Sequence, residues 1–156
     1  MRRNDLWLAA AESCTGGLLS SLITDQPGSS AIFLGGLVSY ANDYKQQFLD
    51  VKESTLIAYG AVSEQTAAEM AHGIRLLSQN ASIPLDKIVG LSITGIAGPG
   101  GGTPQKPVGL VWLGVESAAG ALTRRYQHDS GRLQNKKNFS QQALDLLYEH
   151  LLAGYS

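Results

Sequence analysis

The sequence predicts an α/β protein with three layers, α/β/α, around a mixed, mostly parallel sheet that includes one antiparallel hairpin. Residues 1–156 are expected to form a single domain. Short apolar runs alternate along the chain with segments of helical periodicity, which is typical of layered α/β folds. Two apolar runs near the C-terminus are separated only by residues 116–120, a connection short enough for an antiparallel hairpin.

The N-terminal half supplies two predicted strands and two predicted helices. Residues 6–11 are apolar throughout, so we expect a strand buried on both faces. A helix is expected over residues 15–24, with two glycines near its start, and it stops before Pro27-Gly28. Residues 34–40 form the second apolar run, and Asn42 is able to cap a short helix that ends at Phe48.

The remaining elements follow from the same signals. Ser63 begins a helix to about Gln79, with apolar residues at helical spacing. Residues 87–94 predict a strand that ends in a glycine-rich segment, and residues 108–115 and 121–126 predict the hairpin. A last helix is expected over residues 133–152, with apolar residues along one side.

Composition and charge exclude several classes of partner and site. The 156 residues are 44% apolar and 16% charged, with a formal net charge of -1 at pH 7, so we expect neither nucleic-acid nor membrane partners. No apolar run approaches the ~18 residues that span a bilayer, and no signal segment is evident, which predicts a cytoplasmic protein. Cys14 is the single cysteine, so no intrachain disulfide can form and zinc ligation is not expected.

The segment from Ala11 to Gly17 joins the first strand to the first helix. It delivers a hydroxyl and a thiol to the carboxyl end of a strand, and its two glycines allow a tight turn toward unpaired helix N–H groups. Such a turn suits a nucleophile and an oxyanion. The structural alternative is an N-capping Ser or Thr followed by a glycine-eased turn.

A second candidate site is the glycine-rich loop after residue 94. Five glycines lie between residues 95 and 102, so the amides of this loop can turn inward around an anion such as phosphate. Its spacing matches neither the Walker loop nor the dinucleotide fingerprint. A plain flexible loop is the alternative, although the position after a buried strand favours ligand binding.

Familiar catalytic patterns leave lysine as the candidate base. Ser13 lies in neither G-x-S-x-G nor Ser-x-x-Lys. The three histidines, His72, His128 and His150, are interpreted as surface or packing residues. If Ser13 is a nucleophile, its base is therefore expected to be a lysine.

Five segments, in this order and spacing, resemble the CinA C-terminal domain family: AESCTGG, GSSAIFLGGLVSYANDYKQQFL, YGAVSEQTAAEMA, SITGIAGPGGG and KPVGLVWLGV. The resemblance covers nearly the whole chain. Characterised bacterial members are nicotinamide mononucleotide deamidases, so it implies hydrolysis of that pyridine nucleotide to nicotinic acid mononucleotide and ammonia. It also implies a Ser/Lys acyl-enzyme mechanism on an α/β/α fold, with no cofactor and no metal.

The resemblance also implies roles for individual residues. The nucleophile falls on Ser13, the lysine on Lys45, and a tyrosine that holds the lysine or relays its proton on Tyr40. The hydroxyl at the end of the central strand falls on Thr94, and a phosphate or ribose contact falls on Arg132. From the residues themselves, the backbone N–H groups around Thr15, Gly16 and Gly17 are the expected oxyanion donors, and further substrate contacts are expected at Asn42, Gly95, Gly98 and Gly101. Without the resemblance, Lys45 reads as a solvated helix lysine, Tyr40 as a strand-end aromatic and Cys14 as a small buried residue.

The chain departs from the family pattern in two places. Only residues 1–5 precede the first strand, where most members carry an amphipathic helix, so we expect a homo-oligomer to cover the exposed sheet. The family's Gly-Asp-Arg motif reads Ser130-Gly131-Arg132, which keeps the arginine and loses the acid. These departures leave open an alternative function, a noncatalytic nucleotide-binding or competence-associated interaction protein.

Overall fold

The fold is built on one five-stranded mixed sheet. The computed structural model describes residues 1–155, apart from the side chain of Arg2. The strands are β1 (Trp7–Glu12), β2 (Phe33–Val38), β3 (Ile88–Gly95), β4 (Leu110–Ser117) and β5 (Gly120–Gln127). They lie in the order β2-β1-β3-β4-β5.

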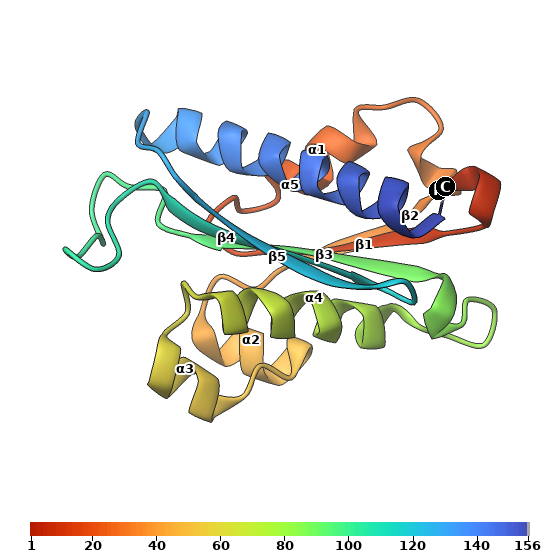
Figure 1. The fold of residues 1–156 in the computed structure, drawn as a ribbon, viewed down its shortest axis with the longest axis horizontal. Helices are drawn as coiled ribbons and strands as arrows, with labels where there is room; N and C mark the ends of the chain where they lie inside the picture. The colour runs from red at the N-terminus through yellow and green to blue at the C-terminus, as the bar shows by residue number, and fades with distance from the viewer. Residues whose placement is uncertain (156) are drawn as a thin grey trace.

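Helices lie on both faces of this sheet (Figure 1). The five α-helices are α1 (Leu18–Thr24), α2 (Asn42–Leu49), α3 (Glu53–Tyr59), α4 (Glu64–Ser78) and α5 (Arg132–Tyr155). Short 3-10 turns cover Arg2–Asn4, Ser29–Ala31 and Leu85–Lys87. Helices α1 and α5 lie on one side of the sheet, and α2, α3 and α4 lie on the other.

The pairing of the strands corrects the predicted sheet. The pairs β1–β2 and β1–β3 are parallel, whereas β3–β4 and β4–β5 are antiparallel. The predicted hairpin is confirmed as β4–β5. The prediction of a mostly parallel sheet is wrong, because β3–β4 is antiparallel as well, which gives two parallel and two antiparallel pairs. The segment from residue 96 to 109 contains no helix, so the chain turns back directly beside β3 without the crossover that a parallel pair requires.

Strand β1 is buried on both faces, as its composition predicts. Its alanines alternate between two apolar clusters: Ala10 packs in one with Leu19 and Phe139, while Ala9 and Ala11 pack in the other with Met70. Small side chains at these positions allow helices to approach the sheet from both sides. The central strand therefore has a fixed position between two packed layers.

Two local details differ from the expected elements. Asn42 does not cap α2, because the N-cap is Ala41 and makes no side-chain cap hydrogen bond.

Helix α3 has no counterpart among the predicted elements; it has seven residues, too few for apolar periodicity to stand out. The Glu69 carboxylate holds its start by accepting hydrogen bonds from Lys52 N (2.9 Å) and Thr55 Oγ1 (2.7 Å). Ser63 caps α4 as predicted, since its side chain accepts from Thr66 N.

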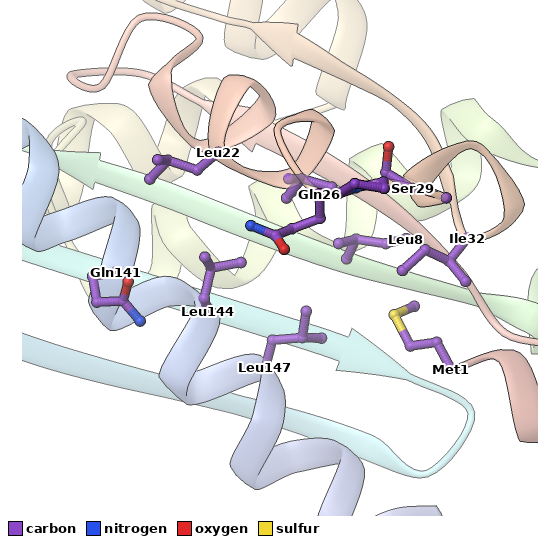
Figure 2. Close-up of a pocket in the computed structure, with 12 residues that line it drawn as sticks. Met1, Leu8, Leu22, Gln26, Ser29, Ile32, Gln141, Leu144 and Leu147 are labelled. Carbon is purple, nitrogen blue, oxygen red and sulfur yellow. The ribbon is translucent and has the colours of Figure 1, made fainter.

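An apolar groove of about 420 Å³ opens on the side of the sheet that carries α1 and α5. Figure 2 shows Leu22 of α1, Leu144 and Leu147 of α5, and Met1 around it. Both faces of the sheet carry helices, and exposed apolar side chains on this side also include Leu133, Tyr148 and Leu152 of α5, outside the groove. Within residues 1–155, no helix is long and apolar enough to cross a membrane.

We expect this chain to form a homo-oligomer, because an apolar groove is more stable when a second copy covers it. Light scattering at micromolar concentration should then give a mass above the 16.5 kDa of one chain. Leu144→Glu, which places a charge in the groove, should shift the mass toward the monomer. A wild-type sample that contains only the 16.5 kDa species contradicts the expectation.

Candidate functional site

The carboxyl ends of the three parallel strands bring the predicted site residues to one edge of the sheet. Ser13 follows β1, the Ser39-Tyr40 pair follows β2, and Thr94 lies at the end of β3. Parallel strands end on the same edge, and β1 lies between the other two. Segments far apart in the sequence therefore meet here.

Ser13 and Lys45 are in direct contact. The Lys45 Nζ atom lies 3.1 Å from Ser13 Oγ, 2.7 Å from the Ser39 carbonyl oxygen and 3.2 Å from the Tyr40 carbonyl oxygen. The Lys45 side chain comes from the first turns of α2 and the residue is only 1% exposed. Burial lowers the pKa of Lys45 to about 8. Lys45 is thus not the solvated helix lysine that its neighbours in sequence suggest.

Cys14 lies beside Ser13, but burial makes its thiol a weak acid. The residue is 7% exposed, and burial raises the pKa of its thiol to about 12. A thiol with this pKa is protonated at neutral pH and is a poor nucleophile. Cys14 therefore behaves as a small buried residue, although it lines the same cavity as Ser13.

The turn after Ser13 is organised around Glu12, a residue with no role among the sequence-based expectations. The Glu12 carboxylate accepts hydrogen bonds from the Thr15 hydroxyl (2.7 Å) and from the amide of Gly17 (2.9 Å). The Gly16 amide donates to the Ser13 carbonyl oxygen at 3.1 Å. Both glycines have positive φ, 62° for Gly16 and 97° for Gly17, as the tight-turn interpretation requires.

These hydrogen bonds occupy two of the N–H groups that are expected to bind an oxyanion. The Gly16 and Gly17 amides donate within the turn, so neither faces a substrate oxyanion. Thr15, Gly16 and Gly17 are also absent from the lining of the cavity beside Ser13. The acidic residue at the strand end, before the unpaired N–H groups of a helix, was the signal available in the sequence.

A cavity of about 270 Å³ lies against Ser13 and Lys45. It is lined by Ser13, Cys14, Tyr40, Lys45, Ala61, Val62, Thr94, Gly95, Ile96, Ala97, Gly98, Gly100, Gly101 and Arg132. The glycine-rich loop and the Ser/Lys pair thus share one cavity. Ile96, Ala97 and Gly100 belong to the glycine-rich loop that the sequence predicts here, whereas Ala61 and Val62 have no such signal, since only packing in three dimensions brings their segment to the cavity.

Three predicted residues of this region have specific partners. Thr94 Oγ1 donates to the Ala61 carbonyl oxygen at 2.6 Å. Arg132 donates through Nη1 to the Gly98 carbonyl oxygen at 2.6 Å and through Nη2 to the Tyr40 hydroxyl at 3.5 Å. Tyr40 therefore meets Lys45 through its carbonyl oxygen and meets Arg132 through its hydroxyl, so the expected tyrosine–lysine contact is made by the backbone.

Asn42 and the histidines lie away from this cavity. Asn42 is exposed at the start of α2 and is absent from the cavity lining. His72 Nδ1 lies 2.9 Å from Glu116 Oε1, and His150 Nε2 lies 2.7 Å from Ser117 Oγ. Among residues 1–155, no group of three or more His, Cys, Asp or Glu side chains is placed to hold a metal ion.

Known proteins are similar to this chain in sequence over nearly its whole length. The chain is 46% identical over 146 residues to a CinA-like protein from Desulforapulum autotrophicum, covering 93% of this chain and 33% of that protein. It is 46% identical over 157 residues to a CinA-like protein from Chloroherpeton thalassium, covering 98% of this chain and 36% of that one. The chain thus spans about a third of the length of the curated relatives that it matches.

Among solved structures, this chain covers most of the length of the matching protein. The competence/damage inducible protein CihA from Agrobacterium tumefaciens aligns with a TM-score of 0.87 at 40% identity, covering 96% of this chain and 87% of that one. A CinA superfamily protein from Klebsiella pneumoniae aligns with a TM-score of 0.88 at 30% identity, covering 97% and 91%. The family described as CinA C-terminal domain matches residues 1–151, and the chain belongs to that family.

Proposed function

We propose that this chain is an amidohydrolase that converts nicotinamide mononucleotide to nicotinic acid mononucleotide and ammonia. The observation that carries the proposal is the 3.1 Å contact between Ser13 Oγ and the buried Lys45 Nζ, at the wall of a cavity that a glycine-rich loop also lines. The family contributes the substrate class, because its characterised members deamidate this nucleotide. We assign the activity to the domain formed by this chain and not to the longer relatives as whole proteins.

The surroundings of Lys45 suit a general base. When the amine is neutral it has two N–H groups and one lone pair. The carbonyl oxygens of Ser39 and Tyr40 take the two N–H groups, which leaves the lone pair for the Ser13 hydroxyl proton. With a pKa of about 8, a fraction of Lys45 is already neutral at pH 7.

The proposed reaction proceeds in two halves. Ser13 Oγ attacks the carboxamide carbon as its proton passes to Lys45, and the resulting ammonium gives that proton to the amide nitrogen, which leaves as ammonia when the C–N bond breaks. Water then attacks the acyl-enzyme ester with Lys45 as base, and Lys45 passes the proton to Ser13 Oγ as the ester bond breaks and the carboxylate product leaves. The Gly16 and Gly17 amides are engaged within the turn, so we assign the oxyanion to the Cys14 amide, which directly follows the nucleophile and belongs to a residue that lines the cavity.

The glycine-rich loop is proposed to hold the 5′-phosphate. Gly95, Gly98 and Gly101 line the cavity together with Thr94 and Arg132, so we assign the phosphate to the amide N–H groups of this loop and the Arg132 guanidinium. Charge-assisted hydrogen bonds of this kind contribute about 1.5–3 kcal/mol each. Part of that binding energy aligns the carboxamide with Ser13, so the phosphate contributes to turnover as well as to affinity.

Purified protein is expected to release ammonia from nicotinamide mononucleotide and to use nicotinamide riboside at least about a hundredfold less efficiently, because two charge-assisted contacts are worth this factor. Comparing kcat/KM for the two substrates measures it. Gly98→Val and Gly101→Val should reduce the difference, since both glycines have positive φ, 87° and 85°. Equal efficiencies contradict the phosphate role, and nucleotide binding without ammonia release favours a noncatalytic binding protein.

A further inference from the structure

The Glu12 carboxylate is the most heavily hydrogen-bonded side chain at the site, and the mechanism above does not use it. It is fully buried and accepts five hydrogen bonds. Oε2 accepts from the Thr15 hydroxyl and from the amides of Gly17 (2.9 Å) and Leu19 (3.1 Å). Oε1 accepts from the Ser20 amide (2.8 Å) and the Ser20 hydroxyl (2.7 Å).

The charge of this carboxylate is balanced by dipoles. Among residues 1–155, the ion pairs are His72–Glu116, Arg75–Glu116 and Arg124–Glu149, so no cation pairs with Glu12. Three backbone N–H groups at the start of α1 and two hydroxyls take its place. Each of these bonds has a charged acceptor, which makes it stronger than a bond between neutral groups. The turn that follows Ser13 begins next to Glu12 and ends at residues of α1 that donate hydrogen bonds to the Glu12 carboxylate.

The backbone of Glu12 also reaches the lysine half of the pair. Its carbonyl oxygen accepts from the Ser39 amide at 2.8 Å and from the Ser39 hydroxyl at 3.3 Å. The Ser39 carbonyl oxygen in turn accepts from Lys45 Nζ at 2.7 Å. Glu12 therefore contacts both halves of the pair: it directly precedes Ser13, and its carbonyl oxygen binds Ser39, whose own carbonyl oxygen accepts from Lys45.

Strand β2 leaves room for this network at Gly36. A Cβ atom at Gly36 would lie 2.1 Å from Ser20 Oγ, the hydroxyl that donates to Glu12 Oε1. Such a contact is far inside van der Waals distance, so any side chain at Gly36 displaces Ser20. Residues of β1, α1 and β2 are thus fitted around one carboxylate.

We propose that Glu12 is a positioning residue that keeps Ser13 Oγ within hydrogen-bond distance of Lys45 Nζ; this inference rests on the proposed Ser/Lys function. Its carboxylate fixes the turn from residue 13 to residue 20, and its carbonyl fixes Ser39. A displacement of about 1 Å between reacting groups lowers turnover on the order of a hundredfold. The substrate-binding loop lies elsewhere in the cavity wall, so substrate affinity is not affected.

Glu12→Gln tests this role because it keeps the shape of the side chain and replaces one acceptor oxygen with an NH₂ group that faces N–H donors. We expect kcat for ammonia release to fall on the order of a hundredfold, with KM within about threefold of wild type. The matched control is Glu69→Gln. Glu69 also accepts from a backbone amide and a hydroxyl at a helix start, but it lies outside the cavity lining. The control should keep wild-type kcat.

A second measurement separates failure of this role from failure of the proposed substrate. The rate at which a fluorophosphonate labels Ser13, followed by mass spectrometry, reports the nucleophile without any nucleotide. Wild type and Glu69→Gln should be labelled, and Glu12→Gln should be labelled on the order of a hundredfold more slowly. If wild type is labelled but releases no ammonia from the mononucleotide, the substrate is wrong and the labelling rates still decide the role of Glu12.

Two milder variants serve if Glu12→Gln does not fold, as judged by circular dichroism. Thr15→Val and Ser20→Ala each remove one of the five hydrogen bonds, and each should slow labelling about fivefold. Labelling of folded Glu12→Gln within twofold of Glu69→Gln overturns the positioning role. Unchanged labelling of both milder variants, or absence of Ser13 labelling in wild type, overturns it as well.

Discussion

Ser13→Ala is expected to lower kcat for ammonia release from nicotinamide mononucleotide by at least about a thousandfold while the protein stays folded. The hydroxyl is the proposed nucleophile, and its hydrogen-bond partner is Lys45 Nζ, 3.1 Å away. Alanine fits the same space at this buried position, since it only deletes the oxygen. Steady-state ammonia release measures the effect, and an unchanged melting temperature shows that the fold is intact.

The matched control is Cys14→Ala, which should keep kcat within about threefold of wild type. The two residues are adjacent, buried and on the same cavity, but the pKa of the Cys14 thiol is raised to about 12 by burial. The Cys14 side chain is therefore protonated during turnover. A Ser13 variant that turns over normally, or a Cys14 variant that alone is inactive, shows that the nucleophile has been assigned to the wrong residue.

Lys45→Met is expected to lower kcat by about a hundredfold to ten-thousandfold, which is the contribution of a positioned general base. Methionine fills much of the buried volume of the lysine and carries no proton acceptor of comparable basicity. Wild-type kcat should rise with pH through about 8, because only the neutral amine accepts the Ser13 proton. A kcat profile that is flat from pH 6.5 to 9.5 contradicts the assignment of Lys45 as the base.

The same lowered pKa makes stability depend on pH. Lys45 has a pKa of about 8 in the folded protein and 10.5 as its ordinary value, so between these values the unfolded chain binds more protons than the folded one. The free energy of unfolding of wild type should therefore rise with pH in this window, relative to Lys45→Met, by about 2–3 kcal/mol. Urea titrations of both proteins at pH 8 and 10.5 measure the difference. An equal pH dependence in the two proteins contradicts a buried, perturbed lysine.

The sequence by itself determined the order of most helices and strands and the segments that meet at the site. The apolar run before Ser13, the glycines after it and the spacing of apolar residues in α4 are local signals. Local propensity and side-chain periodicity carry such information, because each depends on neighbours along the chain. The β4–β5 hairpin is of the same kind, since Ala118 and Ala119 join its strands directly.

The tertiary structure decided what depends on partners far away in the sequence. Sequence could not place β3 antiparallel to β4, because that pairing is set by the path of a loop without periodicity. The residues next to Lys45 in the sequence do not indicate that it is buried, because Asp43 and Tyr44 are polar or amphipathic, and in the structure both are exposed. The side-chain partners of Glu12 are local, three to eight residues away, whereas the contact of its carbonyl oxygen with Ser39 exists only because β2 lies beside β1. Hydrogen bonding and desolvation at this site depend on distance in space, and that distance follows from packing of the whole chain.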